Sequence, residues 1–180
     1  MNKPAKESLV IEFKSDRKCY PLTKLYEDLV GMANTDGGWL FLGIEDNAIP
    51  TGLNHQHRDR QFMEAVIQEN TIPSLYVKTH IENWGGYDVL AIEVPISRQL
   101  MMTAEGKYLR RRLKRDGTPE TVALKPYEIL QRLSYIQAID PSAQVIEDVS
   151  SETALSPLER ERLRNMIRTY HGDMTLLNLS

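Results

Sequence analysis

One thirteen-residue segment, Asn34 to Asp46, constrains the fold more than any other part of the chain. It begins with Asn34 to Gly38, where asparagine and two glycines enter left-handed backbone conformations at low cost, so we predict a helix end and a tight turn. The next stretch, Trp39 to Ile44, is apolar without polar alternation, which is typical of a strand covered on both faces. We therefore predict that it is central in a sheet. Within it, Gly43 predicts close approach by another part of the backbone.

Periodic patterns predict the elements around this segment. Alternating apolar residues predict a strand from Glu7 to Lys14, in which Glu12 and Lys14 share a face. Helices are expected over residues 21–33, over 59–69 and from Pro126 onwards, and a hairpin is expected from strands near 75–81 and 90–94. The resulting fold class is α+β, with a mixed sheet of about five strands flanked by helices and a C-terminal helical appendage.

The chain divides into a core and a C-terminal part. We expect residues 1–138 to form the core domain and residues 139–153, which hold proline, serine and acidic residues without periodicity, to form a linker. Residues 154–180 are predicted to be a helical segment, because Ser156 and Glu159 have capping-box spacing around Pro157. The apolar end of the chain predicts that further domains follow in the natural protein.

Composition excludes several classes of protein. A net charge of −3, with 26% charged and 41% hydrophobic residues, argues against a disordered chain or a basic nucleic-acid arm. The single Cys19 excludes an internal disulfide, fits a reducing cytoplasm and is expected to be an ordinary thiol. His57 lies in a predicted loop without further ligands at metal spacing. No apolar run reaches the roughly 20 residues of a membrane span, so we expect a soluble, cytoplasmic protein.

The one basic cluster lies in residues 107–115, which hold six of the 22 lysines and arginines. Such a cluster suits a phosphate backbone, and a tyrosine within it is available for stacking. The alternative is an ordinary charged edge strand, since charge protects sheet edges and alternation shows only half of the side chains on one face. The residues predicted to contact nucleic acid are Lys14, Tyr108, Arg110, Arg111, Arg112, Lys114 and Arg115.

An acidic set forms the second candidate site. If the first strand lies beside the Trp39 strand, Glu12 and Asp46 reach one edge of the sheet, where carboxylate oxygens suit Mg²⁺ or Mn²⁺ and phosphodiester hydrolysis. Glu7 and Glu12 are an odd number of residues apart, so Glu7 must precede the strand, or a bulge must intervene. The alternative is that these are solvated surface carboxylates.

The motifs together resemble a known family. They are Glu7-x-x-x-x-Glu12-Phe13-Lys14, Ala33-Asn34-Thr35-x-Gly37-Gly38, Leu42-Gly43-Ile44-x-Asp46, Ile72-Pro73, Val94-Pro95-x-Ser97 and Gly106-x-Tyr108-x-Arg110. In this combination, over roughly residues 7–133, the chain resembles the Schlafen Alba-type DNA-binding domain, formerly called a divergent AAA-type domain.

The resemblance implies two functions. Bacterial members are described as DNA-binding transcriptional regulators, which implies DNA rather than RNA as the partner. Animal Schlafens use a pair of such lobes as a metal-dependent endoribonuclease, and its acidic trio corresponds by motif to Glu7, Glu12 and Asp46. This chain holds one lobe and lacks the Cys/His zinc site of the Schlafen core, so a homodimer is a hypothesis. A dimerisation or ligand-sensing module is the third alternative.

Overall fold

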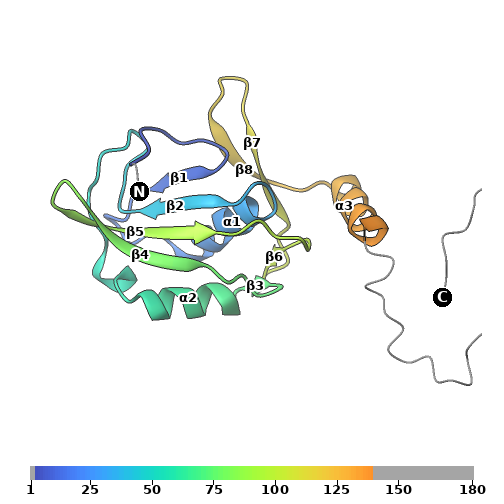
Figure 1. The fold of residues 1–180 in the computed structure, drawn as a ribbon, viewed down its shortest axis with the longest axis horizontal. Helices are drawn as coiled ribbons and strands as arrows, with labels where there is room; N and C mark the ends of the chain where they lie inside the picture. Colours follow the sequence, from blue (N-terminus) through green and yellow to red (C-terminus); the bar gives the residue numbers. More distant parts are fainter. Residues whose placement is uncertain (1–2, 140–180) are drawn as a thin grey trace, which may run out of the picture. The chain divides into compact units, whose positions relative to one another are not determined.

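A four-stranded mixed sheet is the centre of the fold (Figure 1). The strand order is β1-β2-β5-β4, with β1 and β2 parallel and the other neighbours antiparallel. The strands are β1 (Ile11–Lys14), β2 (Gly38–Leu42), β4 (Lys78–Trp84) and β5 (Tyr87–Val94). The strand led by Trp39 therefore has a neighbour on each side, which confirms the prediction that it is central.

The computed structural model describes residues 3–139, which form one compact unit. Its other elements are α1 (Leu22–Ala33), the 3₁₀ helix η1 (His55–His57), α2 (Arg60–Glu69), β3 (Thr71–Ile72), β6 (Met102–Thr103), β7 (Leu109–Leu113), β8 (Pro119–Ala123) and α3 (Pro126–Ile139). No helix among these is long and apolar enough to cross a membrane. Nearly all of the predicted linker and the helical segment over 154–180 lie outside the described residues.

The predicted α+β class, with a mixed sheet flanked by helices, is confirmed. The main sheet has four strands because the basic stretch does not join it. That stretch forms β7, which pairs only with β8 in a separate two-stranded sheet. The first strand is also shorter than the predicted Glu7 to Lys14, since β1 begins at Ile11. Glu7 therefore precedes the strand, which is one of the two solutions that its spacing from Glu12 allowed.

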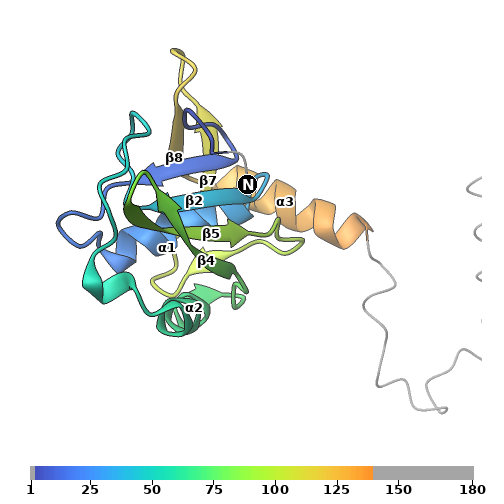
Figure 2. The same ribbon diagram turned by 60° about the vertical axis from the view of Figure 1, so that its left-hand side comes forward.

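Alternation along β2 divides the core into two clusters. Leu40 and Leu42 belong to the cluster formed with the apolar faces of α1 and α2 (Figures 1 and 2). Phe41 lies on the other face of the sheet, in an aromatic cluster with Phe13 and Trp84 whose ring centroids are 5.2 to 6.5 Å apart. Because both faces of β2 are packed, its residues have no need of polar alternation.

Asn34 ends α1 and joins three segments of the chain. Its buried side chain donates from Nδ2 to the carbonyl oxygens of Met101 (2.7 Å) and Leu109 (2.9 Å), and its Oδ1 accepts from the Met101 N–H (2.9 Å). At Gly38, with φ of +122°, a Cβ atom would lie 2.0 Å from the carbonyl oxygen of Val10. The helix end and the turn after Gly37 therefore place β2 directly beside the first strand and fix the start of β7 against α1.

Candidate nucleic-acid interface

Glu7, Glu12 and Asp46 line one cavity beside β1. Its volume is about 380 Å³, and β1, α1 and the β7–β8 hairpin contribute to its walls. Its other polar lining residues are Lys14, Lys24, Glu27, Asp28, Lys114, Glu120 and Thr121. The structure therefore brings the acidic trio together, and it places Lys114 of the basic cluster at the same cavity.

The parallel pairing of β1 and β2 brings the trio together. Both strands end at the same edge, where Lys14 lies opposite Leu42 and the Gly43 N–H donates to the Lys14 carbonyl oxygen (2.7 Å). Gly43 has φ of +101°, and a Cβ atom there would lie 2.9 Å from the backbone of Gly52, which is the close approach that its place in an apolar run predicted. From this turn the chain carries Asp46 to the cavity.

Glu12 is buried and its charge is neutralised on both sides. It is 6% exposed, its Oε1 pairs with Lys14 Nζ and its Oε2 pairs with Arg111 Nη1. Arg111 is 2% exposed, and its Nη2 donates to the Ser8 carbonyl oxygen (2.8 Å). The prediction that Arg111 contacts phosphate does not fit this position, because its guanidinium is enclosed against β1. Lys14 is likewise engaged with Glu12 rather than presented to a ligand.

Asp28 of α1 is a buried carboxylate that the sequence analysis missed. It accepts from the Tyr20 hydroxyl (2.8 Å) and the Thr121 hydroxyl (3.3 Å), and its Oδ2 lies 4.0 Å from Lys14 Nζ. Burial raises the pKa of Asp28, although Lys14 acts to lower it. The available signal was a charged residue next to Leu29 on the helix's apolar side.

Lys14 stays charged in this environment. Burial alone acts to lower its pKa, but the carboxylates of Asp28, Glu12 and Glu7 outweigh burial and raise the pKa above its ordinary value. One ammonium group therefore holds several carboxylates together beneath the cavity.

The acidic trio does not fit the Mg²⁺ or Mn²⁺ that the resemblance implies. Both oxygens of Glu12 already pair with cationic side chains, and Glu7 Oε1 accepts from the Phe13 N–H (3.1 Å). Burial raises the pKa of Glu7, and the nearby Glu12 and Asp46 raise it further, which disfavours the charged form that a cation needs. Within residues 3–139, no three His, Cys, Asp or Glu side chains are grouped so that they could hold a metal ion.

Acidic partners occupy most of the basic cluster. The pairs are Lys107 with Glu27 and Glu105, Arg110 with Glu128, Arg111 with Glu12, and Arg112 with Glu120. Lys114 and Arg115 remain, and both are exposed without an acidic partner in the part of the chain that the structure describes. Tyr108 is half-buried, and its carbonyl oxygen accepts from the Leu124 N–H (2.8 Å).

The two remaining cations lie at the end of a projecting hairpin. Lys114 and Arg115 directly follow β7, next to the Asp116-Gly117 turn that leads into β8. The β7–β8 hairpin extends away from the four-stranded sheet in both views (Figures 1 and 2). The alternation predicted for this strand is present over residues 109–112, because Leu109 and Arg111 are buried whereas Arg112 is exposed, and it ends at Leu113, which is exposed.

Comparison with known proteins shows the family. Residues 7–119 match the family model described as Schlafen, AlbA_2. No curated protein matches the chain. The crystal structure of the DIP2311 protein from Corynebacterium diphtheriae is 20% identical with a TM-score of 0.54, over 72% of this chain and 24% of that one. It therefore shares the fold, and the present chain spans about a quarter of its length.

A second solved structure is the N-terminal domain of a RecG-related protein from Nitrosomonas europaea. It is 24% identical with a TM-score of 0.39, over 51% of this chain and 65% of that one.

The family model covers more than half of the 180 residues. The chain therefore belongs to the Schlafen AlbA_2 family.

Proposed function

We propose that this domain binds nucleic acid through the tip of the β7–β8 hairpin, as a DNA-binding module of a cytoplasmic bacterial transcriptional regulator. The observation that supports the proposal most is the pair Lys114 and Arg115, two exposed cations on a projecting hairpin that have no acidic partner among residues 3–139. Lysine and arginine bind phosphate through charge and hydrogen bonds that do not involve the bases, so such contacts position a protein without reading sequence. Membership of the Schlafen AlbA_2 family agrees with this function.

Two further arginines extend the proposed surface. The Arg112 side chain is 51% exposed in its pair with Glu120, and the Arg110 side chain is 31% exposed in its pair with Glu128. Because Arg112 is exposed and exposed ion pairs contribute about 0–1 kcal/mol, a phosphate can replace its carboxylate partner at low cost, whereas the half-buried Arg110 is less available. Arg111 and Lys14 are left out of this surface because they support the fold beneath the cavity.

The electrostatics of the tip predict modest affinity. Asp116 lies beside the two cations, and its carboxylate accepts from the Thr118 hydroxyl (2.7 Å) and N–H (2.9 Å). These hydrogen bonds lower the pKa of Asp116, so it remains ionised and repels phosphate at neutral pH. We therefore expect weak, strongly salt-dependent binding with little sequence preference.

Fluorescence anisotropy with labelled duplex DNA, single-stranded DNA and structured RNA, over a range of salt concentrations, tests the proposal. The double variant Lys114→Ala/Arg115→Ala should weaken binding and reduce the slope of log affinity against log salt by up to about 1.8 on duplex DNA. Arg60→Ala/Arg98→Ala is the matched control, because it removes the same charge from two exposed positions elsewhere.

The result separates a hairpin contact from a general charge effect. Equal weakening by both double variants, or no binding by the parent chain at low salt, would refute the proposal. Unchanged affinity after loss of the hairpin cations would also refute the hairpin contact, whereas absence of binding by the parent chain would favour the alternative of a dimerisation or ligand-sensing module.

We also propose that two copies of the chain act together. The basis is the paired lobes of the Schlafens that the family resemblance implies, since this chain contains one such domain. Sedimentation velocity of the full chain should then show a dimer at micromolar concentration. A monomer at all concentrations tested would contradict this part of the proposal.

A further inference from the structure

Three side chains outside the acidic cavity form a cysteine–histidine–aspartate arrangement. Cys19 Sγ lies 3.8 Å from His57 Nε2, and His57 Nδ1 lies 2.9 Å from Asp16 Oδ1. Asp16 and Cys19 belong to the loop between β1 and α1, and His57 belongs to η1. A nucleophile, a base and an orienting carboxylate in this order are the parts that activate a thiol.

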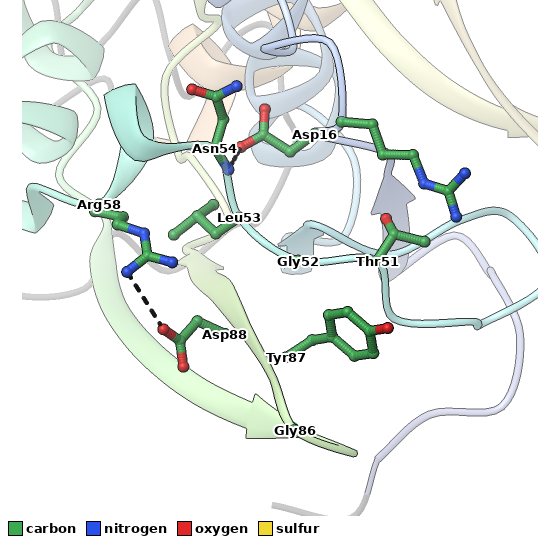
Figure 3. Close-up of a pocket in the computed structure, with 10 residues that line it drawn as sticks. Asp16, Thr51, Gly52, Leu53, Asn54, Arg58, Gly86, Tyr87 and Asp88 are labelled. Carbon is green, nitrogen blue, oxygen red and sulfur yellow. Dashed lines mark hydrogen bonds and ion pairs between the residues drawn. The ribbon is translucent and has the colours of Figure 1, made fainter.

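The histidine and the aspartate form a fixed, buried unit. Asp16 is fully buried and His57 is 2% exposed. The Asp16 carboxylate also accepts from the Tyr20 N–H (2.8 Å) and from the Asn54 N–H (2.7 Å), and Figure 3 shows the second of these bonds. Three donors, His57 Nδ1 and the two backbone N–H groups, hold this carboxylate in place while it orients the imidazole ring.

The aspartate sets which ring nitrogen of His57 is basic. An ionised carboxylate only accepts hydrogen bonds, so the Nδ1 atom facing Asp16 carries the proton of the neutral ring. The lone pair of the ring is then on Nε2, whose one hydrogen-bonding neighbour within residues 3–139 is the Cys19 sulfur. A buried base is therefore directed at a thiol.

The thiol faces a cavity of about 680 Å³. Cys19 is partly exposed there, and Pro21, Leu22 and Phe62 supply apolar walls. The backbone of Cys19 has φ of +58°, a left-handed conformation that is uncommon for residues other than glycine. Such conformations persist where the surroundings hold them, and they are frequent at functional sites.

We propose that Cys19 is an activated thiol that undergoes exchange with apolar disulfides entering this cavity. The Cys19 S–H proton moves to His57 Nε2, and the resulting imidazolium is stabilised by Asp16. The thiolate attacks one sulfur of the incoming disulfide, a new S–S bond forms, and the second sulfur of the reagent leaves as a thiolate. The product is a mixed disulfide on Cys19, with no other oxidant needed.

Gln56 takes part in this step as a neighbour of the sulfur. In the structure Cys19 donates its one S–H hydrogen to Gln56 Oε1 (Sγ to Oε1 3.2 Å), so the S–H bond rotates toward His57 Nε2 before the proton is transferred. After proton transfer the sulfur no longer has a hydrogen to donate, so a rotated Gln56 amide can turn its NH₂ group toward the thiolate. The site thus has a second polar group that can adapt to the charged state.

The chain contains one cysteine, so any thiol signal from it reports on Cys19. The probe is 2,2′-dipyridyl disulfide, a neutral aromatic disulfide, with thiol exchange followed by absorbance and the single adduct checked by intact mass. We expect the native full chain at pH 7 to react about threefold to tenfold faster than the same chain in urea, after correction with N-acetylcysteine in both solvents. The expected gain comes from His57, which takes the S–H proton as the sulfur attacks and which is not held beside Cys19 in the unfolded chain.

His57→Asn is the diagnostic variant, because its amide can still donate to Asp16 while Nε2 is lost. Its native rate should fall to the urea rate, whereas the control His80→Asn on β4, which is exposed, should leave the rate unchanged. A folded His57→Asn chain that reacts like the parent would overturn the proposal. If that variant does not fold, the comparison of the parent chain with and without urea still tests the proposal. A native exchange rate equal to or below the rate in urea would overturn it.

Discussion

Replacement of Arg111 by methionine separates a structural role of this residue from a phosphate-binding role. The change keeps much of the side-chain volume but removes the guanidinium that pairs with Glu12 and donates to the Ser8 carbonyl oxygen. Since Glu12 is 6% exposed, its carboxylate would remain buried, with Lys14 as its one cationic partner within residues 3–139. Breaking a buried ion pair on one side costs about 3–5 kcal/mol.

Lys14 still neutralises part of the charge of the Glu12 carboxylate in this variant. We therefore expect Arg111→Met to lose about 3 kcal/mol in the free energy of unfolding, near the lower end of the range for a broken buried ion pair. For a domain of this size that corresponds to a drop of about 10 °C in Tm. The double variant Glu12→Leu/Arg111→Met should recover most of the loss, because replacing both partners by apolar groups is often neutral.

The assay is urea denaturation of the parent, both single variants and the double variant, combined with nucleic-acid anisotropy on the folded forms. A chain with Arg111→Met that keeps its full stability but loses binding would refute the assignment of Arg111 to the fold. The same reasoning affects cleavage assays with Glu12→Ala, since that change leaves Arg111 and Lys14 facing each other without their shared carboxylate. Any loss of activity must therefore be read against the stability of the variant.

Four other predictions follow from the described contacts. Asn34→Ala removes three buried hydrogen bonds and should cost about 2–4 kcal/mol in urea denaturation, and a cost below about 1 kcal/mol would contradict the role given to its side chain. Gly43→Ala should cost at least about 2 kcal/mol, because it combines positive φ with a backbone clash, whereas Gly117→Ala, which has positive φ in open space, should cost about 1 kcal/mol. Burial raises the pKa of Asp28 above its value in the unfolded chain, so the folded state binds the proton more tightly and stability falls as pH rises through that range. Denaturation at several pH values should therefore show the parent gaining stability relative to Asp28→Asn as pH falls from neutral toward about 4, and a constant difference would refute the assignment. Addition of 1 mM Mn²⁺ should leave Tm unchanged, because the acidic trio is already engaged with other groups. A metal site with a Kd of about 0.1 mM would add about 1.4 kcal/mol of stability, so a clear rise in Tm would contradict this prediction.

Local patterns predicted most of the elements, because their periodicity is a property of neighbouring residues. The helix that ends at Asn34, the central strand led by Trp39 and the hairpin turned at Gly85-Gly86 all carry such patterns, and the structure contains each of them. The alternation in the basic strand was also visible, although not which face would be buried. That choice depends on Glu12, which is distant in sequence and lies on β1.

The polar clusters were not predictable in the same way. A charged residue looks exposed in a local pattern, and only the packing of α1 and the hairpin against β1 shows that Asp28 and Arg111 are buried. Cys19 and His57 each looked unremarkable because neither lies near a partner in sequence. They meet because the Asn54 N–H is bound by Asp16, which ties η1 to the loop before α1.

The end of α1 also links the hairpin to the last described helix. Besides its side-chain bonds to the segments before and within β7, Asn34 accepts at its own carbonyl oxygen from Arg132 of α3. The segment before the hairpin, the base of the hairpin and the last described helix thus share one hydrogen-bonding residue. Asn34 is therefore a common anchor for the base of the hairpin and for α3.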